Sequence, residues 1–150
     1  MALAGMTQEE TYIENRNRCK RIAEDIEAYA NGLIYRCPEC DEILELPENV
    51  GDKYCCPHCK TVSAIDDLER QSLYDYFSDC LDIEYRVSGR GSDDYRSVCI
   101  MVACGGPNIY VDTASKQVEL YWWTDRASYP LSYSACDEID EWAEEYWRCI

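Results

Sequence analysis

The sequence has few basic residues: 14 Lys and Arg stand against 30 Asp and Glu, which gives a formal net charge of −16. A surface this negative repels polyanions, and phosphate binding needs concentrated positive charge, so the composition excludes a general nucleic-acid binder as the leading hypothesis. The chain also has a single histidine, which leaves most of its thiols and carboxylates without an imidazole partner. This scarcity argues against an enzyme.

Long apolar runs are absent as well. The longest, residues 98–104, is the size of a strand and falls far short of the ~20 residues that a membrane helix needs. The N-terminus has neither a basic start nor an apolar stretch of signal-peptide length. We therefore expect a cytoplasmic protein without membrane contact. Thiols stay reduced in that compartment, so the 11 cysteines are interpreted first as metal ligands.

Residues 1–34 are predicted to form an N-terminal unit that consists of one amphipathic helix from about residue 7. Thr7, followed three residues later by Glu10, forms a capping-box pattern. Apolar side chains recur at helical spacing, although Asn15 interrupts their stripe. Packing of this helix on its own domain is favoured over a dimerising coiled coil, because three heptads are marginal. The stripe comprises Tyr12, Cys19, Ile22, Ile26, Tyr29 and Leu33.

Residues 35–62 contain two Cys-Pro-x-Cys motifs with the overall spacing C-x2-C-x15-C-x2-C. Two such turns supply four thiolates in a tetrahedron, which leaves no open coordination position and favours structural Zn²⁺; iron of rubredoxin type is the alternative. Cys55 could replace Cys56, but the symmetry of the motifs favours Cys56, and His58 is expected to point outward. The predicted metal ligands are Cys37, Cys40, Cys56 and Cys59.

The paired motif resembles the zinc-ribbon family, in which two knuckles on short hairpins share one zinc ion. Zinc ribbons often place Gly directly after the second Cys of each knuckle, whereas Asp41 and Lys60 stand there in this sequence. Residues 35–62 hold six acidic and three basic residues, which provide no basic surface for a nucleic-acid backbone. The resemblance therefore implies a ribbon that stabilises the fold or contacts a protein.

Residues 63–150 are predicted to form a larger, acidic α+β domain. Residues 66–81 show helical periodicity, and the pattern then shifts toward the period of two that is typical of strands. The predicted fold class is α+β: the N-terminal helix, a zinc ribbon with four cysteine ligands, then a helix, an antiparallel sheet of about four strands and a C-terminal helix capped by Ser134. The expected strands cover residues 83–87, 97–104, 109–112 and 117–124, with a turn cluster at 88–94 and the sheet ending at Tyr129-Pro130.

The last predicted strand carries large aromatic side chains on both faces. Val118, Leu120 and Trp122 are in phase and are expected in the core. Tyr121 and Trp123 then face the other way. Cover by a helix is the favoured interpretation for these two side chains, and an exposed interface patch is the alternative.

The negative charge is concentrated in the third part of the chain, since 11 of the 16 net units lie after residue 62. The predicted C-terminal helix places carboxylates opposite its apolar stripe, where they could occupy the basic groove of a nucleic-acid-processing enzyme. A solvated face kept for solubility is the competing interpretation. The candidate partner-binding acids are Asp137, Glu138, Asp140, Glu141, Glu144 and Glu145, and Tyr121 and Trp123 are added as candidate contacts.

The string Ala-Cys-Gly-Gly-Pro-Asn-Ile-Tyr-Val-Asp-Thr at residues 103–113 resembles the core motif of small acidic proteins of bacterial plasmids, conjugative elements and phages. Leu-Tyr-Trp-Trp at 120–123 and Ile-Asp-Glu at 139–141 resemble its continuation. Such proteins keep company with anti-restriction and anti-CRISPR genes. The resemblance implies a non-enzymatic, protein-binding factor of a mobile element that inhibits its partner by nucleic-acid mimicry. The alternative is a zinc-ribbon adaptor that binds a transcription or replication protein.

Overall fold

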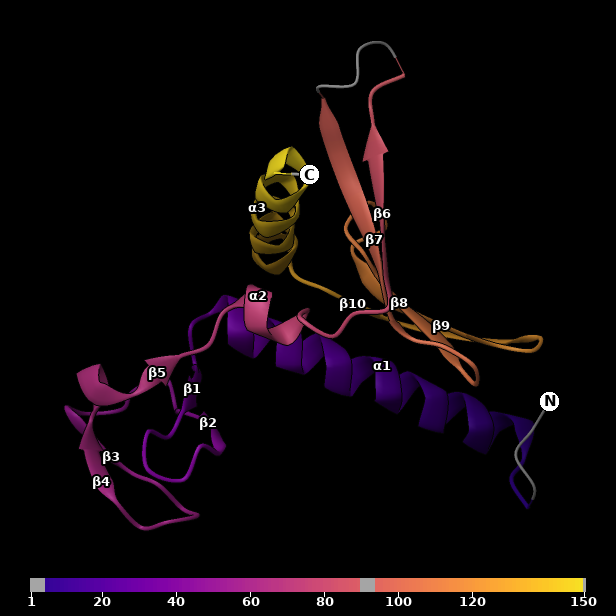
Figure 1. Ribbon diagram of the computed structural model, residues 1–150. Helices are drawn as coiled ribbons and strands as arrows, with labels where there is room; N and C mark the ends of the chain where they lie inside the picture. Colours follow the sequence, from indigo (N-terminus) through magenta and orange to yellow (C-terminus); the bar gives the residue numbers. More distant parts are fainter. Residues whose placement is uncertain (1–4, 90–93, 150) are drawn as a thin grey trace.

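The computed structural model describes residues 5–89 and 94–149 and combines helices with antiparallel sheets (Figure 1). Within these residues no helix is long and apolar enough to cross a membrane. The first half of the chain contains α1 (Gln8–Ala30), β1 (Ile34–Arg36), β2 (Ile43–Glu45), β3 (Lys53–Cys55), β4 (Val62–Ala64), the 3-10 turn η1 (Ile65–Asp67) and β5 (Glu69–Arg70). The second half contains α2 (Leu73–Tyr76), β6 (Asp82–Val87), β7 (Tyr95–Ala103), β8 (Asn108–Asp112), β9 (Gln117–Trp122), β10 (Asp125–Pro130) and α3 (Tyr133–Cys149).

The main sheet has five strands rather than about four. Its order, β10-β9-β8-β7-β6, is a meander in which each strand pairs antiparallel with the next. The strand missing from the prediction is β10, which pairs with β9 after the two-residue turn Trp123-Thr124. Trp123 adopts a φ of +57° in that turn. Tight hairpin turns with positive φ are normally signalled by Gly, Asn or Asp, so the residue types at this turn did not indicate it.

Helix α1 starts as predicted, because Thr7 Oγ1 accepts from the Glu10 backbone N–H at 3.1 Å and the Glu10 carboxylate accepts from the Thr7 N–H. Cys19 and Ile26 of the predicted stripe are buried, and Ile22 and Tyr29 pack against the core, but the first turns of the helix differ from the prediction. Tyr12 is 51% exposed, whereas Asn15 is buried and its side-chain amide has no hydrogen-bond partner among the described residues. An unpaired buried amide costs roughly 1–3 kcal/mol, which the surrounding apolar contacts of α1 must offset.

The predicted helix over residues 66–81 is largely wrong. Only Leu73–Tyr76 form an α-helix, which begins after Ser72, whose backbone N–H donates to the Asp75 carboxylate at 2.7 Å. Residues 69 and 70 instead pair with β1 and extend its sheet. Strand pairing at this point removes the N-terminal half of the expected helix, a tertiary effect that local periodicity does not contain.

One face of the main sheet is covered by α1 and α3, so the core lies between the sheet and these helices (Figure 1). Helix α1 packs along β9 and β10, and α3 lies over the β7 side. Ser132 connects the two helices, because its backbone N–H and hydroxyl donate to the Glu27 carboxylate at 2.7 and 2.8 Å. Ser132, rather than the predicted Ser134, also caps α3, since its hydroxyl accepts from the Ala135 N–H.

The buried residues fall into two clusters. The larger cluster joins the sheet to α1, α2 and α3, with Ile26, Ile100 and Ile139 fully buried. The smaller one lies in residues 33–70, here called the knuckle region, and contains Cys37, Leu44, Leu46, Cys56 and Leu68. The knuckle region therefore has its own small core, separate from that of the sheet.

Candidate functional site

The structure brings four cysteine side chains of the knuckle region together. The Sγ atoms of Cys37 and Cys59 lie 3.7 Å apart, and those of Cys40 and Cys56 lie 3.6 Å apart. All four sulfur atoms lie within 4.8 Å of one another. A tetrahedral metal site with metal–sulfur bonds of about 2.3 Å needs sulfurs about 3.8 Å apart. The cluster therefore has the size and the donor set to hold a metal ion.

Two similar turns position these thiols. In the first, the Asp41 N–H donates to the Cys37 carbonyl at 2.9 Å, and in the second the Lys60 N–H donates to the Cys56 carbonyl at 2.9 Å. The left-handed position after each second cysteine is occupied by Asp41 (φ +64°) and Lys60 (φ +63°). The turns thus form without the glycine that a zinc ribbon often places there. Their strain is small enough for these side chains to tolerate, since isolated αL residues cost roughly 1–3 kcal/mol.

The pKa values of two thiols of the cluster, Cys40 and Cys59, are shifted in opposite directions. Hydrogen bonds from the side chain and the backbone of Thr61 lower the pKa of Cys59 to about 6. A backbone hydrogen bond from Glu42 favours the Cys40 thiolate, but burial and the proton shared with the neighbouring sulfurs raise the pKa of Cys40 to about 12. Thiolates this close repel one another, so a bound cation is needed for all four to ionise together.

Cys55 and His58, the two other potential ligands considered from the sequence, lie outside the cluster. Cys55 is exposed, and its Sγ lies 3.6 Å from the Lys60 carbonyl oxygen rather than among the other sulfurs. His58 is exposed between Cys56 and Cys59 and is not part of the group. Cys56 is therefore the member of the second motif that reaches the cluster.

The six candidate acids of α3 have different environments. Asp140 is half-buried and accepts a 2.6 Å hydrogen bond from the Tyr95 hydroxyl, which ties α3 to β7. Glu144 is half-buried and forms an ion pair with Arg148 at 2.8 Å. The remaining four are exposed and are here called the acidic face: Asp137, Glu138, Glu141 and Glu145.

The two candidate aromatic contacts are both exposed, so the favoured expectation of a covering helix is wrong. Trp123 is 78% exposed at the β9–β10 turn. Tyr121 is 37% exposed, but its ring contacts Tyr110 and the Arg126 guanidinium, and its hydroxyl donates to Glu119. Trp123 is thus the more available of the two for a partner.

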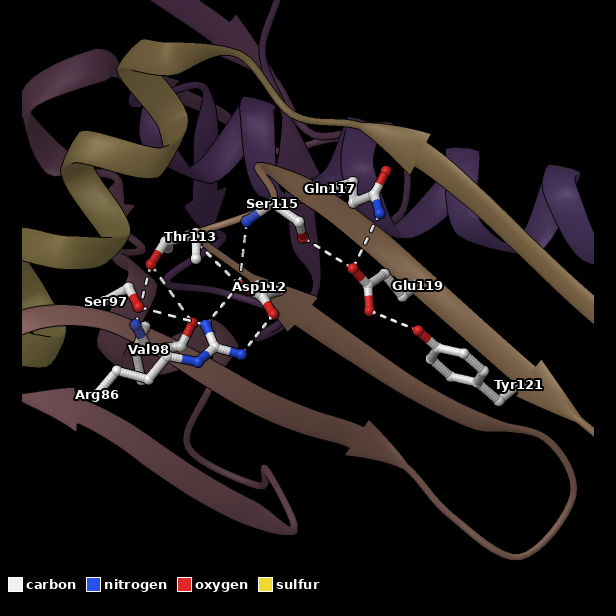
Figure 2. Close-up of polar contacts among 10 residues, drawn as sticks. Arg86, Ser97, Val98, Asp112, Thr113, Ser115, Gln117, Glu119 and Tyr121 are labelled. Carbon is white, nitrogen blue, oxygen red and sulfur yellow. Dashed lines mark hydrogen bonds and ion pairs between the residues drawn. The ribbon is translucent and has the colours of Figure 1, made fainter.

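Sequence reasoning missed a polar network on the sheet face that α1 and α3 leave uncovered (Figure 2). Arg86 of β6 donates two hydrogen bonds, of 2.9 and 2.8 Å, to the Asp112 carboxylate of β8, and a third to Ser97 of β7. Glu119 of β9 collects hydrogen bonds from Ser115, Gln117 and Tyr121. The alternation of polar residues along each strand was the available signal. The hydrogen-bond donors and acceptors of this network pair with one another across several strands. We therefore expect the network to help fix the register of the strands.

Replacing Asp112 by Asn is expected to lower the free energy of unfolding at pH 7 by about 2 kcal/mol, because Arg86 loses its charged partner. Burial alone would raise the pKa of Asp112, but hydrogen bonds from Arg86, Ser115 and Ala114 hold it below the usual value. The pair therefore stabilises the fold above about pH 4, and this contribution is lost as the pH falls through the folded pKa. Urea titrations at several pH values between 7 and 3 measure the free energy of unfolding of Asp112→Asn and of the wild type. The two values should converge as the pH falls.

The exposed Asp52→Asn variant is the control for that experiment, since it removes the same charge from a position without a side-chain ion pair among the described residues. It should follow the wild type at every pH. A constant difference between Asp112→Asn and the wild type down to pH 3 would contradict the proposed linkage.

Three thiols outside the knuckle region are poor nucleophiles. Burial raises the pKa of Cys19, Cys99 and Cys136 to about 11 in each case. At neutral pH they remain protonated, and the thiol form neither attacks a carbonyl nor binds a metal well. Cys19 and Cys136 pack in the main core as small apolar side chains, whereas Cys99 is half-buried.

Comparisons of the chain with protein-family models, with curated proteins and with solved structures found no match. The cysteine cluster and the surfaces of the fold therefore provide the available indications of function.

Proposed function

We propose that this chain is a non-enzymatic, acidic protein-binding factor of a bacterial mobile element, with a zinc-ribbon unit that holds structural Zn²⁺. In this proposal the acidic face of α3 competes with nucleic acid for a basic surface of a nucleic-acid-processing enzyme. Inhibition of a restriction or CRISPR enzyme is the specific form that the motif resemblance of residues 103–113 implies.

The observation that carries the proposal is the fixed orientation of the acidic face. Helix α3 packs Ile139, Trp142 and Ala143 into the core, so its exposed carboxylates lie outside that buried stripe. The four acids span residues 137–145, which corresponds to about one charge per 4 Å of helix axis. One DNA strand carries a phosphate every ~3.4 Å along its axis. The spacing of charge therefore suits a surface that binds a nucleic-acid backbone.

The four sulfurs suit the proposed Zn²⁺, and iron of rubredoxin type uses the same donor set. Zn²⁺ prefers four tetrahedral sulfur or nitrogen ligands in structural sites, and a complete set of thiolates leaves no position for a reacting water. Metal binding here would hold the two knuckles together and supply no catalysis.

The test is displacement of a DNA-bound protein. Bacterial cytoplasmic extract is loaded on double-stranded DNA-cellulose at about 50 mM salt, the purified protein is added, and released proteins are identified by mass spectrometry. The expected result is release of a discrete DNA-binding protein that co-purifies with this chain. Raising the salt to about 200 mM should weaken that complex at least tenfold.

Two variants with equal net charge provide the control. Neutralising the acidic face should abolish the displacement, whereas neutralising four exposed acids of the knuckle region should leave it intact. Equal behaviour of the two variants, or a complex insensitive to salt, would contradict the proposal. The first variant is Asp137→Asn/Glu138→Gln/Glu141→Gln/Glu145→Gln, and the second is Glu39→Gln/Glu42→Gln/Glu48→Gln/Asp52→Asn.

The second candidate function is an adaptor that binds a transcription or replication protein through the zinc ribbon and the aromatic surface. The exposure of Trp123 favours it, because large aromatic side chains at interfaces often carry much of the binding energy. In that case Trp123→Ala and Tyr121→Ala would lose the co-purified partner. The variant in which the four acids of the acidic face are neutralised would keep it.

A further inference from the structure

An aromatic groove of about 480 Å³ opens between α2, the strand β6 and the second half of α3. Tyr74 and Phe77 line it from α2 and its C-terminal end, Ile83 and Tyr85 from β6, and Trp142 and Tyr146 from α3. Trp142 stacks on Phe77 with ring centroids 5.1 Å apart and meets Tyr74 edge-on at 5.7 Å. The floor of the groove is therefore a packed aromatic cluster that belongs to the main core.

The rim of the groove exposes large apolar side chains. Tyr74 is 46% exposed, Leu81 58% and Tyr146 44%. Single exposed apolar residues are normal on a protein surface, but several around one concave site mark a place where another molecule binds.

Two polar atoms on residues that line the groove have no hydrogen-bond partner among the described residues. They are the indole Nε1 of Trp142, a residue that is only 7% exposed, and the hydroxyl of Tyr85. The indole N–H is a donor only and needs an acceptor such as a backbone carbonyl. Leaving such a group unpaired costs about 1–3 kcal/mol. Both atoms are buried, so they mark imperfect packing beneath the groove rather than contacts for a ligand.

The groove runs beside the free edge of the main sheet. Strand β6 is the last strand in the sheet order, so one side of its six-residue backbone pairs with no strand of the described chain. An unpaired edge is a template for an added strand, and peptide recognition often uses such an edge together with a pocket for alternate side chains.

The charges around the groove select a basic occupant. Asp82 lines it, Asp79 and Glu84 flank it in the chain, and Glu145 of α3 interacts with Tyr74 on its rim. Among the described residues no basic side chain lines the groove, and the cation of β6, Arg86, is bound to Asp112. A second copy of this chain, with its net charge of −16, would be repelled here.

We propose that the edge of β6 and the aromatic groove together bind an extended peptide segment of a partner protein, in which apolar residues alternate with Lys or Arg. The segment adds a sixth strand to the sheet, places an apolar side chain in the groove and brings its cations to the acids around it. This binding site shares only Glu145 with the acidic face and does not require competition with nucleic acid.

The test is selection of a phage-displayed library of random twelve-residue peptides against the full-length protein. The expected result is enrichment of peptides that alternate apolar and basic residues. A synthetic copy of an enriched peptide should bind with one-to-one stoichiometry. N-methylation of alternate amides should weaken it at least tenfold, because the methyl groups remove hydrogen-bond donors from one side of an added strand.

A matched pair of triple variants locates the site, and thermal unfolding first verifies that both are folded. Tyr74→Ala/Leu81→Ala/Tyr146→Ala, which truncates the rim, should weaken binding at least tenfold. Ile13→Ala/Val62→Ala/Tyr133→Ala truncates three apolar residues elsewhere that are at least 50% exposed and should leave the affinity unchanged.

Several results would overturn the proposal. They are the absence of enriched peptides, equal binding to both triple variants, and full affinity of the N-methylated peptide. Sedimentation of the wild type as a dimer that the rim variant dissociates would show instead that the groove is a contact between two copies of this chain.

Discussion

Replacing Cys56 by Ser is expected to abolish metal binding and to unfold the knuckle region while the five-stranded sheet remains folded. The small cluster of the knuckle region has five buried residues, two of which are cysteines of the four-thiol cluster. So small an apolar core does not hold a fold without additional cross-links. In zinc-finger peptides the metal contributes about 10–16 kcal/mol to folding. The free energy lost with the metal would therefore exceed the stabilisation that this small apolar core can supply.

The measurements are zinc content per chain by elemental analysis and hydrogen exchange of the backbone amides. The expected values for Cys56→Ser are less than a tenth of the zinc bound by the wild type, and unprotected amides in β1 to β4. Protection in β7, β8 and β9 should persist, because these strands belong to the other cluster. Elemental analysis also distinguishes zinc from iron in the wild type.

Cys55→Ser is the matched control, since it makes the same substitution one residue earlier. Cys55 is exposed and lies outside the cluster, so this variant should bind metal and protect its amides as the wild type does. If Cys56→Ser retained metal while Cys55→Ser lost it, the assignment of the second motif would be reversed. If both retained it, the four-thiolate site would be refuted.

The cysteine cluster could be predicted from the sequence because its geometry is local. Two residues between cysteines fix a turn, and the repetition of the motif identifies the partner turn, so little depends on the rest of the fold. The capping box of α1 is equally local, and Thr7 and Glu10 interact as their spacing predicts. The in-phase residues Val118 and Leu120 were also identified correctly, and both are fully buried.

The errors arose where tertiary contacts override local pattern. Helical periodicity over residues 66–81 predicts five buried residues, namely Leu68, Leu73, Phe77, Cys80 and Leu81. The first three are buried, whereas Cys80 is half-buried and Leu81 is 58% exposed. Leu68 belongs to the knuckle region, and Leu73 and Phe77 belong to the main core. The helix prediction was wrong because residues 69 and 70 pair with β1, so the chain is extended between the two cores. The network of Arg86 and Asp112 was missed for a related reason, since 26 residues separate two side chains that only the sheet register joins.

The acidic face illustrates a further limit. The sequence placed six acids on one helix, but it could not show that Asp140 is held by Tyr95 and Glu144 by Arg148. Which carboxylates remain available depends on neighbours from β7 and from the end of α3. The aromatic groove lay beyond sequence analysis altogether, because its walls come from three elements that are distant in the chain.

Replacing Ile26 by Ala is expected to lower the free energy of unfolding by about 2–5 kcal/mol, the largest effect of any single truncation in α1. Ile26 is fully buried in the cluster that contains Val118 and Leu120 of β9, so its removal leaves a cavity between helix and sheet. Urea unfolding followed by tryptophan fluorescence measures the change. Loss of secondary structure should coincide with the fluorescence transition, because α1 and the sheet share one core.

Ile13→Ala is the control, since it removes the same atoms from the same helix at a residue that is 50% exposed. Helix propensity changes equally in the two variants, so their difference reports burial alone, and Ile13→Ala should stay within about 0.5 kcal/mol of the wild type. Equal effects of both substitutions, or melting of α1 before the sheet, would mean that α1 is a separate unit. If the secondary structure and the fluorescence signal are lost together, α1 and the sheet form one folding unit. The knuckle region is then an insertion between two parts of that unit. That arrangement explains why removing the metal should spare the sheet, whereas truncating Ile26 should not.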